Sequence, residues 1–265
     1  MKPLHNLQLV NKEIQMKTVV ITGAASGMGL AASKLFLEKH WRVLMIDTNE
    51  EHGQQQCLKL QSQGFTEVYF QRCDITQASQ VSRVAEFAID NFGRVDSVIN
   101  NAGVWRGGEL HQTTETDWDL LFDVDVKSIF LMSKYFVPHM IAQGGGTIVN
   151  TASVSGLNGD HQMAAYNAAK GAVVNLVRAM ALDYGKYNIR VNNVCPAACA
   201  TPMFLANAKE VIDTFNQANP LGRICTPEEV AEAMYFLASD ASSSCNGINL
   251  PISGGLELHT GQPIQ

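Results

Sequence analysis

Residues 18–29 read Thr-Val-Val-Ile-Thr-Gly-Ala-Ala-Ser-Gly-Met-Gly, and this stretch decides the fold of the 265-residue chain. Its five apolar or β-branched residues predict a buried strand, and the amphipathic residues after the glycines predict a helix. Glycines between a strand and a helix let the backbone approach a pyrophosphate, which the N–H groups and dipole of the helix N-terminus attract. We therefore expect this turn to bind a nucleotide through Gly23, Ser26, Gly27, Met28 and Gly29.

The same alternation of short apolar runs and longer amphipathic stretches continues along the chain. The predicted strands are Thr18–Thr22, Val43–Ile46, Val68–Phe70, Val95–Ile99, Thr147–Asn150, Arg190–Val194 and Ile248–Leu250. The predicted helices cover about 28–39, 50–63, 77–92, 115–142, 162–187 and 227–238. Continuously apolar strands separated by helices indicate an α/β fold: a Rossmann-like, doubly wound, seven-stranded parallel sheet with helices on both faces.

The length and the absence of linkers or repeats predict one dinucleotide-binding and catalytic domain over residues 16–265. Residues 1–15 precede the regular pattern, and we expect a disordered N-terminal extension there. Residues 197–226 lack strand periodicity and contain Pro202 and Pro220, with Pro227 directly after them. We expect a substrate lid in this segment, the alternative being a simple surface excursion.

Composition and charge exclude several classes of protein. The formal net charge of −6 and the lack of basic runs argue against nucleic acid or an anionic membrane as a partner. Six cysteines without a Cys-x-x-Cys pair predict free thiols and no metal site. No signal peptide or segment of transmembrane length is evident, so we expect a cytoplasmic protein.

Polar residues at the ends of the second, third and fourth predicted strands fit the same nucleotide. Asp47 ends the second strand, where a carboxylate accepts the hydroxyls of an adenosine ribose and repels a 2′-phosphate, which favours NAD over NADP. Its alternative role is to open the turn before the next helix. We expect further cofactor contacts from Asp74, Ile75, Asn101, Ala102 and Gly103.

Tyr166 lies four residues before Lys170 in a predicted helix, and Ser153 lies thirteen residues upstream of Tyr166. Residues at i and i+4 share a helix face, so the Lys170 ammonium should lower the pKa of the Tyr166 phenol. A phenol so activated is a general acid/base, and a serine hydroxyl can hold the substrate oxygen. A half-buried helix that merely contains both residues is the alternative for the pair alone.

These motifs, in this order and spacing, resemble the short single-domain branch of the short-chain dehydrogenase/reductase family over about Lys17 to Gly255. The resemblance implies that Tyr166 is the general acid/base and that Ser153 binds the substrate oxygen. It implies that Lys170 lowers the pKa of Tyr166 and, with Tyr166, contacts the cofactor. Pro196 and Thr201 would grip the nicotinamide amide.

The chain departs from the family pattern at two positions. Asp125 stands where the family usually has a catalytic asparagine, and Ala197 stands where a glycine is common. A buried carboxylate near Lys170 would partly neutralise the ammonium and raise the pKa of Tyr166, moving the pH optimum up. We include Asp125 with Ser153, Tyr166 and Lys170 among the candidate catalytic residues.

The resemblance predicts an NAD-dependent oxidoreductase that interconverts a secondary alcohol and a ketone. The alternative is a catalytically impaired NAD-binding sensor or scaffold. Trp105, His161 and Met163, with Ser153, are the candidate substrate contacts, although Trp105 can equally pack on a loop and His161 can equally face solvent. Apolar residues on the two long predicted helices suggest a homodimer or homotetramer.

Overall fold

The computed structural model describes residues 16–258, so the expected extension at 1–15 lies outside the described part. Seven strands form one parallel sheet in the order β3-β2-β1-β4-β5-β6-β7. They are β1 (Thr18–Thr22), β2 (Arg42–Asp47), β3 (Val68–Arg72), β4 (Ser97–Asn100), β5 (Gly146–Thr151), β6 (Ile189–Pro196) and β7 (Asn249–Ile252). The order reverses between β1 and β4, which confirms the predicted doubly wound fold.

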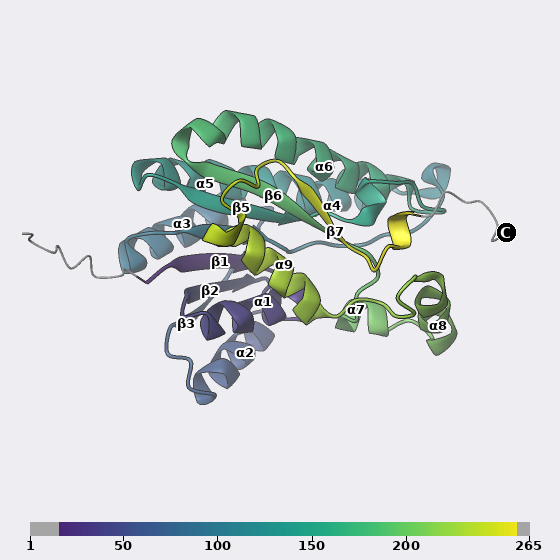
Figure 1. The fold of residues 1–265 in the computed structure, drawn as a ribbon, viewed down its shortest axis with the longest axis horizontal. Coiled ribbons are helices and arrows are strands. Elements are labelled where there is room, and N and C mark those ends of the chain that lie inside the picture. Colours follow the sequence, from purple (N-terminus) through teal and green to yellow (C-terminus); the bar gives the residue numbers. More distant parts are fainter. Residues whose placement is uncertain (1–15, 259–265) are drawn as a thin grey trace, which may run out of the picture.

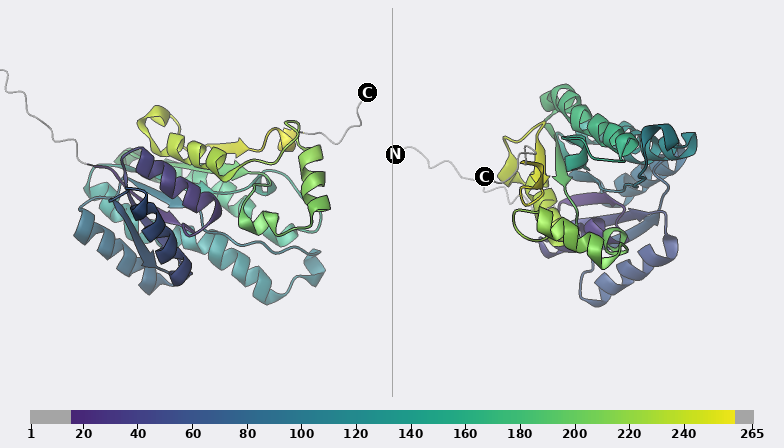
Figure 2. Two further views of the ribbon diagram at one scale, coloured as in Figure 1. Left: turned by 90° about the horizontal axis from the view of Figure 1, so that it is seen from below. Right: turned by 90° about the vertical axis from the view of Figure 1, so that its right-hand side faces the viewer.

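Helices cover both faces of the sheet (Figures 1 and 2). On one face lie α1 (Gly27–Glu38), α2 (Glu50–Ser62) and α9 (Pro227–Ala238), packed in one apolar cluster. On the other face lie α3 (Ala78–Phe92), α5 (Ser128–Ala142) and α6 (Ala164–Tyr184) in a second cluster. The central strands are buried between them, as the continuously apolar runs predict.

The predicted helix at 115–142 is interrupted. It consists of α4 (Glu115–Phe122), a π-helical turn η2 (Asp123–Lys127) and α5. The wide turn places Asp125 inward, where its Oδ1 accepts the Val104 N–H at 3.0 Å. Such turns often occur at functional sites, and the apolar periodicity of the sequence does not reveal this one.

The segment at 197–226 contains no named strand, but it is helical in two places. The helices α7 (Pro202–Leu205) and α8 (Lys209–Ala218) lie at the carboxyl side of the sheet, outside the two helical layers (Figure 1). No residue of α7 or α8 is buried. We use "the 197–226 segment" for this region below.

Four asparagines join the neighbouring strands β4, β5, β6 and β7. Their side-chain amides form a continuous chain: Asn100 donates to Asn150 at 2.8 Å, Asn150 to Asn193 at 3.0 Å, and Asn193 to Asn249 at 2.7 Å. The strand register places these residues side by side. Because buried polar groups are costly without partners, this asparagine ladder pins the register of half the sheet.

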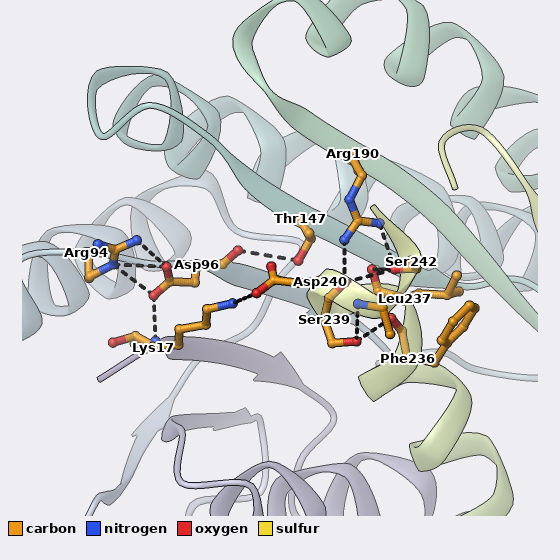
Figure 3. A network of polar contacts seen from close by, with 12 residues as sticks. Lys17, Arg94, Asp96, Thr147, Arg190, Phe236, Leu237, Ser239, Asp240 and Ser242 are labelled. Carbon is orange, nitrogen blue, oxygen red and sulfur yellow. Dashed lines mark hydrogen bonds and ion pairs between the residues drawn. The ribbon is translucent and has the colours of Figure 1, made fainter. Parts of the chain in front are cut away.

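Polar side chains connect the strands at the opposite, amino edge (Figure 3). The Thr18 N–H donates to Asp96 at 2.8 Å, and Arg94 pairs with the same carboxylate. Lys17 pairs with Asp240 at 3.0 Å beyond α9. These contacts tie β1 and β4 to the C-terminal part of the fold.

Among residues 16–258, no helix is long and apolar enough to span a membrane. The same residues contain no cluster of three or more His, Cys, Asp or Glu side chains suited to a metal ion.

Candidate active site

A cavity of about 390 Å³ opens at the carboxyl edge of the sheet, within the size range of ligand pockets. It lies where the strand order reverses, which is where open α/β sheets bind ligands. Most of the predicted site residues line it: Gly23, Ser26, Gly27, Met28, Asp47, Asp74, Ile75, Asn101, Ala102, Gly103, Trp105, Ser153, Tyr166, Lys170, Pro196 and Thr201. Gly29, Asp125, His161 and Met163 are not in the lining.

The glycine turn has the geometry that a phosphate cradle requires. Gly23 and Gly27 have φ values of +64° and +52°, which favour glycine. A Cβ at Gly29 would lie 2.2 Å from the Gly23 carbonyl oxygen. The α1 N-cap, Ser26, makes no side-chain capping bond, and the first turn of α1 has no acidic residue. The N–H groups at this end are therefore suited to an anionic ligand, which fits the pyrophosphate of a dinucleotide.

Thr22 and Asn101 fix the loops after β1 and β4 to each other. The Thr22 hydroxyl accepts the N–H groups of Asn101 and Ala102, both at 3.0 Å. The Asn101 amide donates to the Thr22 carbonyl at 3.1 Å. The sequence pattern included Thr22 in the strand and at the start of the glycine motif, but not among the site residues. Its contacts show that it holds together the two loops that line the cavity.

Asp47 faces the cavity and also supports its wall. One carboxylate oxygen accepts the Ala25 N–H at 3.1 Å, and the other accepts the Asn49 N–H at 3.0 Å before α2. Each carboxylate oxygen can accept a further hydrogen bond, so the turn-opening role does not exclude binding of a ribose.

The hydrogen bonds of Asp74, unlike those of Asp47, lie within its own loop and the helix that follows. Its Oδ1 accepts both the N–H and the hydroxyl of Thr76, at 3.0 Å and 2.7 Å. Its backbone N–H is held in turn by Gln80 at 2.9 Å. Asp74 lines the cavity from this hydrogen-bonded turn.

Tyr166, Lys170 and Ser153 meet at one end of the cavity. The Lys170 ammonium lies 5.7 Å from the centre of the Tyr166 ring and donates to the Thr151 carbonyl at 3.0 Å. The Ser153 hydroxyl donates to the Pro196 carbonyl at 3.3 Å and accepts the Ser155 N–H at 3.1 Å. The sequence reasoning missed Thr151, although its position at the end of β5 was a usable signal.

Asp125 lies behind this group. Its Oδ2 is buried without a hydrogen bond, 3.7 Å from the Lys170 ammonium. The carboxylate also approaches the loop after β4, because a Cβ on Gly103 would lie 2.9 Å from Oδ1. Asp125 thus contacts the lysine and not the cavity.

The electrostatics of the group differ from the expectation based on Lys170 alone. Burial, the largest effect, raises the pKa of Tyr166; Lys170 and Ser153 lower it, and Asp125 and Asp160 raise it further. The net direction is upward. Burial also raises the pKa of Asp125 against the attraction of Lys170, whereas the charge of Asp125 keeps the pKa of Lys170 high despite its burial.

Trp105 lines the cavity, and Met163 supports it from outside the lining. The indole N–H of Trp105 points to the Met163 sulfur at 3.0 Å, and the Gly108 N–H bonds to the Gln162 carbonyl at 2.6 Å. These contacts tie the loop after β4 to the start of α6. His161 is exposed beside them.

Comparison with known proteins identifies the family. A family model described as "Enoyl-(Acyl carrier protein) reductase" matches residues 23–257. The chain belongs to the short-chain dehydrogenase/reductase family. As a member it is an oxidoreductase related to alcohol dehydrogenases, and the family uses a nicotinamide cofactor.

Among its relatives, the meso-2,3-butanediol dehydrogenase of Serratia marcescens is 42% identical. The match covers 93% of this chain and 97% of the relative. The cyclopentanol dehydrogenase of Comamonas testosteroni is 35% identical, with 90% of this chain and 96% of the relative covered. A solved 3-ketoacyl-(acyl-carrier-protein) reductase from Brucella melitensis, complexed with NADH, is 28% identical with a TM-score of 0.86. It covers 91% of this chain and 98% of its own.

Proposed function

We propose that this short-chain dehydrogenase/reductase interconverts a secondary alcohol and a ketone with NAD. One observation carries the proposal: Tyr166, Ser153 and Lys170 line the same cavity as the glycine turn and Asp47. A single cavity therefore offers a dinucleotide cradle and a proton-transfer group.

In this proposal the nicotinamide cofactor supplies or accepts the hydride, and the protein orients the substrate and handles one proton. Ser153 binds the substrate oxygen. The Tyr166 phenol gives a proton to that oxygen during ketone reduction, and the phenolate removes it during alcohol oxidation. Lys170, held by the Thr151 carbonyl, favours the phenolate and binds the nicotinamide ribose. Asp125 positions and partly neutralises Lys170.

The preference for NAD rests on the adenosine end of the cavity. Asp47 would receive the ribose hydroxyls and repel a 2′-phosphate, and the neighbouring lining residues Ser26 and Thr48 carry no positive charge to bind that phosphate. Gly29 would act as the close-approach glycine. Pro196 and Thr201 would contact the nicotinamide end.

The substrate we propose is a small, uncharged alcohol or ketone. The charged side chains in the lining are Asp47, Asp74 and Lys170, all assigned to the cofactor in this proposal. The rest of the lining includes the apolar residues Val104, Trp105, Ala197, Pro202 and Met203. The named relatives above that act on butanediol and cyclopentanol support this class. Met163 supports Trp105, and His161 would reach only a polar group at the rim.

We also propose a homodimer or homotetramer. The apolar residues Met132, Phe136, Val173, Val177 and Met180 of the two long helices α5 and α6 are buried in the core. Phe130 on α5 and Leu182 on α6 are instead 56% and 84% exposed and support the association of these helices. Light scattering of the purified protein measures the oligomeric state directly.

Turnover tests the proposed function. Purified protein is mixed with NAD⁺ or NADP⁺ and a panel of cyclic and acyclic secondary alcohols, and the reduced cofactor is followed by absorbance. We expect turnover with NAD⁺, lost in Tyr166→Phe but kept in Tyr187→Phe, a tyrosine outside the cavity. NAD⁺ binding by calorimetry should survive both changes. Binding without turnover of any alcohol or matching ketone by the unaltered protein would favour the sensor instead.

A further inference from the structure

Two cysteines lie opposite each other at the base of the 197–226 segment. Cys199 and Cys225 form an isolated parallel bridge, in which the Ala200 N–H donates to the Cys225 carbonyl at 2.9 Å. The Cys225 N–H donates to the Ala198 carbonyl at 3.2 Å. Paired parallel residues lie about 5 Å apart at Cα, inside the range that a disulfide spans.

The pairing places the two thiols next to each other, because paired residues of a parallel bridge project their side chains to the same side. The Cys225 thiol donates to the Ala198 carbonyl at 3.3 Å. Each thiol also influences the pKa of the other through a side-chain hydrogen bond. Both residues are reduced in this structure, with about 5% of their surface exposed.

The contact makes the two sulfurs unequal. The hydrogen bond from Cys199 lowers the pKa of Cys225, with a smaller contribution from Arg223, against burial and the nearby Glu229. The same hydrogen bond raises the pKa of Cys199, together with burial and with Glu228 and Glu229. Burial raises the pKa of Cys57, Cys73 and Cys195. Of these thiols, Cys225 is the one favoured as a thiolate, the form that reacts.

The position of the pair links it to the cavity. Residues 200–224 lie between the two cysteines and include Thr201, Pro202 and Met203 of the lining, as well as α7 and α8. Thr201 is two residues from Cys199, and its side chain caps α7. We call the paired residues Cys199 and Cys225 the neck of the segment. A disulfide between them would close residues 199–225 into a covalent loop.

We propose that Cys199 and Cys225 form a reversible disulfide that clamps the neck of the 197–226 segment. The oxidant is a peroxide. The Cys225 thiolate attacks one peroxide oxygen, the O–O bond breaks, and Cys225 sulfenic acid and hydroxide form. The Cys199 sulfur then displaces the sulfenic oxygen as water, and the S–S bond forms. In total the two thiols lose two electrons and two protons, and hydrogen peroxide becomes two waters. A dithiol reverses the reaction.

Mass spectrometry of the full chain after hydrogen peroxide treatment tests the proposal. We expect a chain lighter by two hydrogen atoms, with the loss of two titratable thiols, both reversed by dithiothreitol. Tryptic peptides 191–209 and 224–265 should become linked. Because these peptides also contain Cys195 and Cys245, the link is assigned in the double variant Cys195→Ser/Cys245→Ser, where Cys199 and Cys225 are the remaining thiols of the two peptides.

Two single variants complete the test. Cys199→Ser and Cys225→Ser should each abolish the linked peptide, and Cys199→Ser should instead accumulate sulfenic acid on Cys225, detected by dimedone. Cys57→Ser, a change in α2 outside the two linked peptides, should leave the link intact. A linked peptide that is absent from the oxidised unaltered chain, or that persists in either single variant, overturns the proposal.

Discussion

The Asp125 carboxylate lies 3.7 Å from the Lys170 ammonium, and both side chains are buried. An ion pair at this depth links the state of one group to that of the other. Lys170 lies beside Tyr166, so the charge of Asp125 reaches the phenol through the lysine as well as directly.

Asp125→Asn removes a negative charge while keeping an oxygen for the Val104 N–H. Alcohol oxidation needs the Tyr166 phenolate, so its rate rises as pH passes upward through the pKa of Tyr166. Burial and Asp125 raise that pKa, and Lys170 lowers it. Asp125→Asn should therefore shift the rise of the oxidation rate to lower pH, by roughly one pH unit. The pH profile of the turnover rate measures this shift.

Asp123→Asn is the matched control, because Asp123 lies in the same π-helical turn but pairs with exposed Lys127 at 3.0 Å. Its profile should match that of the unaltered protein. An unchanged profile in Asp125→Asn would contradict the coupling.

Asp47→Asn should weaken the discrimination between the two cofactors. The neutral amide keeps an acceptor for the Ala25 N–H but loses the charge that favours ribose hydroxyls and repels a 2′-phosphate. We expect the KM for NAD⁺ to rise by about tenfold and the preference over NADP⁺ to fall by at least as much. Glu50→Gln, an exposed change at the start of α2, should alter neither. A retained preference would mean that another group selects the cofactor.

Gly29→Ala should damage the cradle directly. The added Cβ would lie 2.2 Å from the Gly23 carbonyl oxygen and 2.7 Å from the Asn101 amide nitrogen. We expect the free energy of unfolding to fall by about 1–3 kcal/mol, and NAD⁺ binding by calorimetry to weaken. Gly159→Ala meets no atom within 4 Å and is the control. Equal affinity in both variants would show that the turn does not bind the cofactor.

Asn150→Ala should destabilise the sheet from its centre. The change leaves the Asn100 amide and the Asn193 oxygen without their partner in the asparagine ladder. We expect a loss of about 2–3 kcal/mol in the free energy of unfolding by urea titration. Asn91→Ala removes an exposed amide bonded to the Phe87 carbonyl and should cost far less. If both variants lost a similar free energy of unfolding, the asparagine ladder would stabilise the sheet no more than an exposed side-chain hydrogen bond does.

The regular elements could be predicted from sequence because their signals are local. The strand at Thr18–Thr22 and the helix at Pro227–Ala238 match the expected bounds, the helix being marked by a capping box at Thr226. The π-helical turn at Asp123–Lys127 and the short helices α7 and α8 were missed. The turn depends on a tertiary bond to Val104, and the 197–226 segment is too broken by prolines and too exposed to show a clear period.

The candidate site could be assembled because its residues follow the ends of parallel strands, which meet at one edge. The net direction of the pKa of Tyr166 could not be foreseen in the same way. It depends on how deeply the ring is buried and on where Asp125 and Asp160 come to lie, which are properties of the folded chain.

The ion pairs of Figure 3 lie at the amino edge of the sheet. None of the residues that form them lines the cavity at the carboxyl edge. Distant substitutions usually combine additively. Engineering for heat resistance at Lys17, Arg94 or Asp240 and engineering for a new substrate at Trp105 or Met203 are therefore separable tasks. A library of substitutions at the carboxyl edge can therefore be screened for new substrates in a protein already stabilised by substitutions at the amino edge.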